Sequence, residues 1–192
     1  MTFEDFYEQV SHLCFDTDVS DYRDLFVDAM NRAFRQVTSV RPRMSFATYN
    51  LTNTDSDVTK VNVRELVGDA YNRMPTNPVR DSIGLVVSNQ QYTFLNKDTI
   101  MFLPSAKAGV YIIDYLVRSP KFDLDSFESD ADVDIDDDLA DAVVLLVAYY
   151  VLLGEDEDKA AAYLSRYYEK ISEIKQTVAT NAPNGYTNAN GW

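Results

Sequence analysis

The stretch that decides the fold is residues 136–154, DDDLADAVVLLVAYYVLLG. Its three leading carboxylates favour the positive end of a helix dipole. After them, Asp141 is the only charged residue up to Leu153, so a helix here has almost no face suited to water. Gly154 then supplies a stop signal. We therefore expect a central helix that neighbouring segments must surround.

The chain that follows predicts a second helix packed against the first. It begins in the acidic residues 155–158 and runs for about twenty residues. Apolar side chains recur along it at helical spacing, at Leu164, Tyr167, Tyr168, Ile171, Ile174 and Val178. With Gly154 between them, the two segments predict an αα-hairpin.

Residues 3–37 predict two more amphipathic helices. The stripe of the first is Phe3, Phe6, Tyr7, Val10 and Leu13, and that of the second is Tyr22, Leu25, Phe26, Ala29, Ala33, Phe34 and Val37. Residues 16–18 separate them, and Ser20 is the expected N-cap of the second helix. Pro42 ends it, because the residue before a proline is pushed out of the α region.

The middle of the chain changes to short β-type runs. Residues 83–88, 91–95, 99–103 and 110–117 predict strands, joined by short connections into one antiparallel meander. Residues 50–80 are ambiguous, because Val61 and Val63 alternate as in a strand whereas residues 64–71 could form a helical turn.

Two further segments lack a regular period. Residues 122–138 hold nine Asp or Glu in seventeen positions, which predicts an exposed connector too charged to pack. Residues 181–192 are small and polar apart from Tyr186 and Trp192, which predicts a flexible tail.

These elements predict an α+β fold, in which a helical bundle is formed by the N- and C-terminal segments and carries an inserted small antiparallel β-sheet. The bundle takes residues 1–43 and 136–180, and the β-rich insertion takes residues 44–120. The acidic connector is then residues 121–135, and the tail is residues 181–192.

The composition excludes several classes of function. With 31 acidic and 17 basic residues the chain carries a net charge of −14, which argues against nonspecific binding to nucleic acid or anionic lipid. The longest apolar run, residues 142–153, would span only about 18 Å as a helix, so we expect no membrane span. The acidic N-terminus does not resemble a secretory signal, and we expect synthesis in the cytoplasm.

No strong catalytic motif is present in the sequence. The six glycines form neither a GxGxxG fingerprint nor a P-loop. His12 and Cys14 are two residues apart on a predicted helix, which directs them to different faces. One His and one Cys cannot assemble a common zinc site. We therefore expect no catalytic residue, no metal ligand and no cofactor.

The most motif-like pattern is Asp130-x-Asp132-x-Asp134, which has the first ligand spacings of an EF-hand loop. Its sixth position is Ile135 instead of Gly, and its twelfth is Asp141 inside the expected helix. A calcium-binding interaction module is therefore one alternative. A carboxylate-dependent hydrolase is another, although nothing singles out a catalytic pair among the acids.

The C-terminal third carries a resemblance to a known family. Its acidic lead-in DDDLADA, the helix ending in YYVLLG, and the segment EDEDKA before a helix with Tyr167-Tyr168-Glu169 resemble the head-to-tail adaptors, or connectors, of tailed bacteriophages. Those of short-tailed phages, in which a sheet accompanies the bundle, are the most similar.

The resemblance implies a structural virion protein of the neck, made in the host bacterial cytoplasm. Such a protein forms a twelvefold ring beneath the portal, extends the DNA channel and receives a downstream tail or nozzle protein. DNA would pass without specific binding, which suits a chain at −14. The tails of this family bind the portal, so Tyr186 and Trp192 are the expected anchors, being residue types that dominate interfaces.

Overall fold

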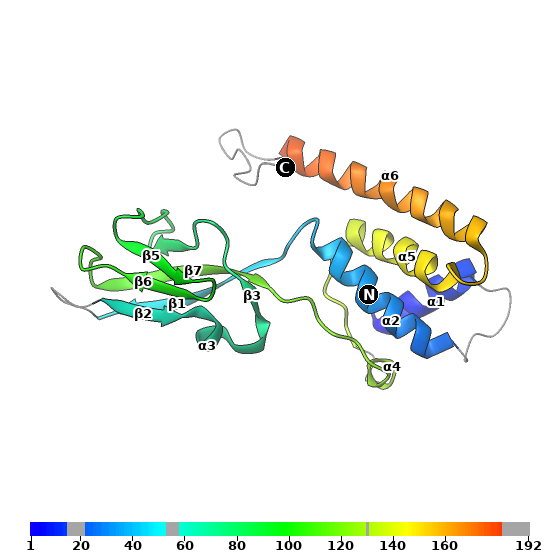
Figure 1. Cartoon of the computed structure of the whole chain (residues 1–192), viewed down its shortest axis with the longest axis horizontal. Coiled ribbons are helices and arrows are strands. Elements are labelled where there is room, and N and C mark those ends of the chain that lie inside the picture. The colour runs from blue at the N-terminus through cyan, green and yellow to red at the C-terminus, as the bar shows by residue number, and fades with distance from the viewer. Residues whose placement is uncertain (15–21, 53–57, 130, 182–192) are drawn as a thin grey trace. The chain divides into compact units, whose positions relative to one another are not determined.

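The computed structural model describes residues 1–14, 22–52, 58–129 and 131–181 (Figure 1). The chain divides into two compact units. The helical unit joins Met1–Arg41 to the chain from Pro120 onward, and the sheet unit is Pro42–Ser119. Helices in the first and two small antiparallel sheets in the second confirm the α+β class.

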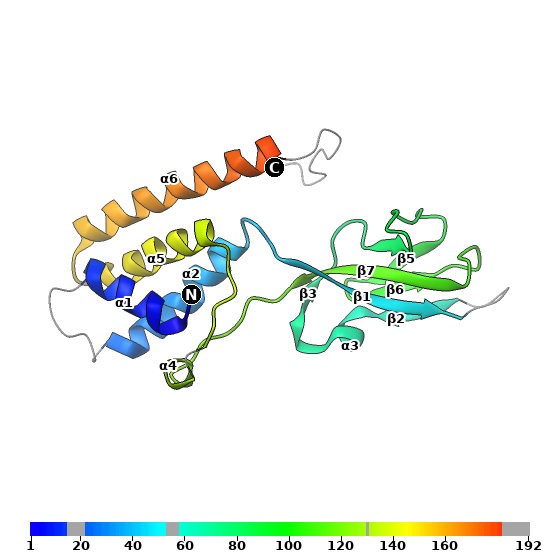
Figure 2. The same cartoon turned by 180° about the vertical axis from the view of Figure 1, so that it is seen from behind.

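The helical unit is built around one buried helix. Its helices are α1 (Phe3–Cys14), α2 (Arg23–Thr38), α4 (Asp125–Glu128), α5 (Asp137–Leu152) and α6 (Glu157–Asn181). α1, α2 and α6 all pack against α5, and ten of its sixteen residues are buried. Figure 2 shows α6 running alongside α5. The predicted central helix and αα-hairpin are confirmed.

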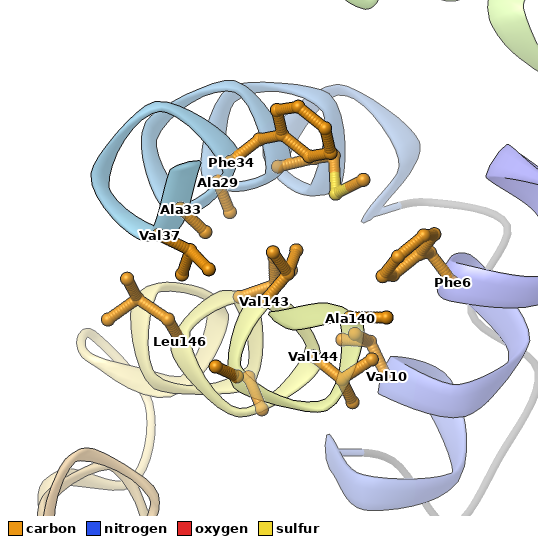
Figure 3. Packing of buried hydrophobic residues seen from close by; sticks show 14 of the residues in the cluster. Phe6, Val10, Ala29, Ala33, Phe34, Val37, Ala140, Val143, Val144 and Leu146 are labelled. Atoms are coloured by element: carbon orange, nitrogen blue, oxygen red, sulfur yellow. The ribbon is translucent and has the colours of Figure 1, made fainter. Parts of the chain in front are cut away.

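The interface between α2 and α5 is lined by small side chains. Ala29, Ala33 and Val37 of α2 lie toward Val143 and Leu146 of α5 (Figure 3). On the other side of α5, Phe6 and Val10 of α1 lie toward Ala140 and Val144. Small residues allow two helix axes to come close, so α5 is enclosed by its neighbours.

Local hydrogen bonds explain where α1 begins. The Thr2 amide donates to Asp5 Oδ2 at 2.7 Å, and the Asp5 amide donates to Thr2 Oγ1 at 3.2 Å. This is a capping box with Asp in the place of Glu. For α2 the structure gives Tyr22 as the N-cap, without a side-chain cap hydrogen bond, where the sequence predicts Ser20. Ser20 and residues 16–18 lie outside the described residues.

The acidic connector packs more closely than the sequence predicts. Phe122 and Val133 are only 5% and 3% exposed, so the expectation of a fully exposed segment is wrong. The Phe3 amide donates to Ala131 O and the Val133 amide donates to Met1 O, both at 2.9 Å. Phe122 and Val133 are buried while the side chains of Asp123, Asp125 and Asp132 are exposed.

Phenylalanine rings pack together where the connector contacts the first two helices. The Phe3 ring lies 5.0 Å from that of Phe122, 4.8 Å from that of Phe127 and 5.3 Å from that of Phe26, measured between centroids. Ring contacts at these distances add to the stabilisation from buried area. The connector is therefore part of the core of the helical unit.

Asn31 of α2 fixes the start of the connector. Its Nδ2 donates to Phe122 O at 2.8 Å, and its Oδ1 accepts from the Phe122 amide at 2.9 Å. The same Nδ2 lies 2.9 Å from Val27 O. One amide side chain thus satisfies both backbone groups of a buried residue 91 positions away.

The sheet unit contains seven strands in its described part. They are β1 (Met44–Leu51), β2 (Thr59–Asn62), β3 (Tyr71–Arg73), β4 (Val79–Asp81), β5 (Tyr92–Asn96), β6 (Thr99–Phe102) and β7 (Gly109–Val117), with α3 (Val63–Val67) and a 3₁₀ turn (Gly68–Ala70) between β2 and β3. β7 is the centre of one sheet, paired with β1, β3 and β4, and β6 is the centre of the other, paired with β2 and β5.

The two sheets share an apolar core. The Tyr49 ring stacks on Phe102 with centroids 6.0 Å apart, and Tyr111 lies 4.8 Å from Phe102. Leu51, Ile100 and Ile113 are also buried in this cluster. Each sheet therefore has an inner face, which packs on the other sheet, and an outer face.

The single predicted meander is wrong, although its β5–β6 hairpin is confirmed. β7 does not pair with β6, because the link through Pro104 carries the chain into the other sheet, where β1 offers β7 an eight-residue partner. Residues 83–88 form a turn and one isolated bridge, whereas the strand is β4. On α6, Tyr168 is 59% exposed, so it does not belong to the buried stripe.

Candidate interaction surface on the sheet unit

The outer face of the β7 sheet exposes a row of side chains from β1. Opposite residues of an antiparallel pair point to the same side of a sheet. The register places Met44 opposite Leu116 and Phe46 opposite Asp114. Met44, the first residue of β1, and Phe46, two positions further along, are 59% and 61% exposed, which is a high exposed fraction for large apolar residues of a paired strand.

The same face continues across β7 to its other neighbours. Arg73 of β3 lies opposite Leu116, and Arg80 of β4 lies opposite Ile112. Val86 bridges to Arg80 and is 61% exposed. We use the term outer face for the side chains that this register places together: Met44, Phe46, Thr48, Asn50, Arg73, Arg80, Val86, Val110, Ile112, Asp114 and Leu116.

An ion pair fixes the centre of the outer face. Arg80 Nε donates to Asp114 Oδ2 at 2.7 Å, and Arg80 Nη2 donates to Asp114 Oδ1. Asp114 is only 7% exposed, so the forked contact is shielded from water on the carboxylate side. Such a bidentate pair is geometrically specific and leaves no net charge at the centre of the face.

Beside the outer face, a rigid turn presents two more apolar side chains. The Asp81 carboxylate accepts from the amides of Ile83 and Leu85 at 3.0 and 2.9 Å. The Asp81 amide donates to Leu85 O at 2.8 Å, and Gly84 takes the positive φ of 87° that the turn requires. Ile83 and Leu85 are 77% and 62% exposed. Holding aliphatic side chains in water on a fixed backbone is typical of a contact surface.

Charge and exposed apolar groups are segregated between the two units. The sheet unit has eight Lys or Arg against seven Asp or Glu, a net charge of +1, whereas the rest of the chain has nine against 24, a net charge of −15. Among the described residues, ten of the fifteen exposed large apolar side chains belong to the shorter sheet unit. The sheet unit therefore has the surface suited to protein contacts, and the helical unit has the surface that repels polyanions.

Two residues of the calcium pattern that the structure describes, Asp132 and Asp141, have separate ion-pair partners. Asp130 lies outside the described residues, and the Asp132 side chain is 84% exposed beside the Met1 ammonium at 3.6 Å. Asp141 instead accepts from Lys170 Nζ of α6 at 2.7 Å. Within the described ranges, no group of three His, Cys, Asp or Glu side chains is arranged to hold a metal ion.

His12 and Cys14 lie in different environments. His12 is exposed, whereas Cys14 is 7% exposed with its Sγ 3.9 Å from Ala148 O of α5. Burial raises the pKa of the Cys14 thiol to about 12, so the nucleophilic thiolate is scarce at neutral pH. The sequence-predicted anchors Tyr186 and Trp192 lie outside the described residues.

A comparison with protein families decides the assignment of the chain. A family model described as SU10 adaptor protein matches residues 1–188. The chain belongs to the SU10 adaptor protein family. The predicted resemblance to phage head-to-tail adaptors is therefore confirmed. None of the curated proteins matches the chain.

Membership of the SU10 adaptor family makes this a structural protein of the virion neck. A head-to-tail adaptor acts through contacts with portal and tail proteins. Across the described residues, no helix combines the length and hydropathy needed to cross a membrane.

Sequence reasoning missed the outer face, although residues 44–50 carry a signal for it. Met44, Phe46 and Thr48 alternate with Ser45 and Ala47, the period of a strand with two different faces. What the sequence could not show is that the larger side chains lie on the exposed side.

Proposed function

We propose that the protein forms a ring beneath the portal, continues the portal's DNA channel and attaches the tail. The observation that carries this proposal is the segregation of a helical unit at −15 from a sheet unit at +1 that is rich in exposed apolar side chains. A neck component needs both properties, because it has to bind other proteins strongly and allow DNA to pass through its channel.

The negative charge of the helical unit supports the proposed passage of DNA. DNA-binding proteins gain affinity by replacing counterions at phosphates with Lys and Arg. In the helical unit Asp and Glu outnumber Lys and Arg by 24 to nine, so several copies around a channel would create a potential that repels the phosphate backbone. Sequence-specific contacts are not needed for this role.

We propose that residues 181–192 attach the protein to the portal. This segment has no charged residue and holds two aromatic residues, Tyr186 and Trp192. Aromatic side chains are common binding anchors, whereas ordering the backbone costs about 1 to 2 kcal/mol per residue. Binding would therefore depend on several tails of one ring engaging together, which raises the apparent affinity through effective concentration.

The test combines native mass with attachment to portal-bearing heads. We expect the full chain mixed with its portal to give a ring of defined stoichiometry. Replacing both Tyr186 and Trp192 by Ala should leave thermal stability unchanged and weaken co-sedimentation with heads at least tenfold. Replacing Asn184 and Asn188 by Ala is the matched control, which alters the same tail and keeps both aromatics. Unaltered co-sedimentation of the aromatic variant would exclude the tail as the portal anchor.

A further inference from the structure

We propose that the outer face of one copy docks on the acidic turn between α5 and α6 of a second copy. We define the acidic turn as residues 153–158, LGEDED. The inference rests on the proposed ring and names the two surfaces that join its copies. It makes each contact heterologous, so that every copy uses its outer face toward one neighbour and its acidic turn toward the other.

The outer face has the properties of a surface that is covered in the assembled protein. β1 pairs with β7 alone among the described strands, so its other edge is an unpaired edge eight residues long. Exposed edges of this length that carry large apolar side chains are prone to associate with other chains. Met44 and Phe46 of β1, Val110 of β7 and the bridge residue Val86 beside β4 are each at least 47% exposed and make the face apolar.

Charge disfavours contact between two outer faces. Arg73 lies on the face, and Arg118 follows directly after β7, and both are exposed. The central Arg80 is already matched by Asp114 within the same copy. Two outer faces brought together would therefore place Arg73 and Arg118 of each copy against like charges, which lowers the affinity of a symmetric pair.

Charge also disfavours contact between two helical units, which carry −15 each. The remaining combination, a sheet unit against a helical unit, brings a weakly basic surface to an acidic one. Heterologous contacts of this kind close into rings when the rotation between copies allows it. The charge segregation within one chain thus selects the geometry of assembly.

The acidic turn is complementary to the outer face, because it combines an exposed apolar side chain with acidic residues that can pair with Arg73 and Arg118. Leu153 is 48% exposed, and four consecutive acids, residues 155–158, follow Gly154. The turn is rigid, because the amides of Glu155 and Asp156 both donate to Leu152 O at 2.9 Å. Asp156 Oδ1 also accepts from the Lys159 amide at 2.9 Å, which fixes the start of α6.

Phe46→Asp and Leu153→Asp test the two surfaces separately. Both side chains are exposed, so neither change should alter folding, which thermal denaturation verifies. We expect each variant alone to lose self-association at least tenfold in sedimentation velocity, with and without the portal. Phe94→Asp is the matched control, because Phe94 is 44% exposed on β5 of the other sheet, and it should change association less than twofold.

Mixing the two variants tests whether the contact is heterologous. In an equimolar mixture, the intact acidic turn of Phe46→Asp can bind the intact outer face of Leu153→Asp, so we expect a heterodimer and no larger ring. A symmetric contact between outer faces predicts instead that Leu153→Asp associates with itself and that Phe46→Asp joins no complex, and this result would overturn the proposal. So would a Phe46→Asp variant that assembles normally and loses only its attachment to the portal or tail.

A charge swap provides an independent readout. Arg73→Glu should weaken association at least tenfold, and adding Glu157→Lys in the acidic turn should restore it. Lys60→Glu makes the same change of charge on exposed β2 and should have little effect. Failure of Glu157→Lys to restore assembly would contradict the pairing. Normal rings in all variants would refute this inference but leave the proposed function intact, whereas no ring from the wild-type chain with its portal would refute the proposed function.

Discussion

Asn31→Ala is expected to loosen the acidic connector from the helical unit. Asn31 is the only side chain that bonds both the amide and the carbonyl of Phe122, at 2.9 and 2.8 Å, among the contacts of the described residues. Alanine keeps α2 helical and removes both partners at once. The Phe122 backbone is then left to find water at a position that is 5% exposed.

The magnitude follows from two lost hydrogen bonds and a gain in helix propensity. Leaving a buried polar group unsatisfied costs about 1 to 3 kcal/mol, so the two Phe122 groups together cost about 3 kcal/mol if part of the segment relaxes into water. Replacing Asn by Ala inside a helix returns about 0.6 kcal/mol. We expect a net loss of about 2 kcal/mol in the free energy of unfolding of the helical unit.

Urea denaturation followed by far-UV circular dichroism measures this loss, since the helical unit dominates the signal at 222 nm. Hydrogen exchange at the Phe122 amide should accelerate in parallel, by about tenfold or more per 1.4 kcal/mol of local stability lost. Arg32→Ala is the matched control on the next, exposed position of α2 and should stay within about 0.5 kcal/mol. A similarly small effect for Asn31→Ala would show that the connector is held by its aromatic residues alone.

Three further outcomes are expected. A thiol reagent at pH 8 should leave Cys14 unlabelled in the folded protein and label it fully after unfolding, and Cys14→Ser should retain adaptor function, because the thiol with a pKa of about 12 is buried. Burial and neighbouring Asp98 raise the pKa of Tyr71 to about 12, from about 10 in the unfolded chain. The contribution of neutral Tyr71 to stability is therefore complete below pH 10 and is lost as the pH rises toward 12. Thermal denaturation of wild type and Tyr71→Phe between pH 8 and 12 measures whether the stability difference changes in this direction. Calorimetry with calcium should show no tight site, whereas micromolar binding lost when Asp130, Asp132 and Asp134 become Asn would favour a calcium-binding module.

The helices were predictable because their signals are local. The apolar spacing that ends at Val37 and the run that begins at Leu139 each span a few turns of one helix, and hydrogen bonds of a helix close within four residues. The central position of α5 followed from its lack of a polar face. The acidic character of the helical unit was likewise a property of the sequence alone.

The prediction that the connector is exposed was wrong because it rested on the average charge of the whole segment. Nine acids in seventeen residues describe the segment as a whole, whereas burial is decided side chain by side chain. Phe122, Phe127 and Val133 are spaced so that each can reach α1 or the core while the side chains of Asp123, Asp125 and Asp132 are exposed. The number of acidic residues in the segment gives no information on how its apolar residues are spaced.

The sequence by itself determined the α+β class, the four long helices on either side of a β-rich middle, the central position of one of these helices and the net charge, since each depends on residues close together in the chain or on composition. Only the tertiary structure decided the sheet topology and the outer face. β7 pairs with β1, and Met44 and Leu116 are opposite each other although 72 residues apart. Strand pairing is a long-range choice among competing edges, and which side of a strand is exposed depends on where the second sheet packs. Phe46 is therefore exposed, while Tyr49 stacks on Phe102 in the core, because β6 and β7 lie in different sheets.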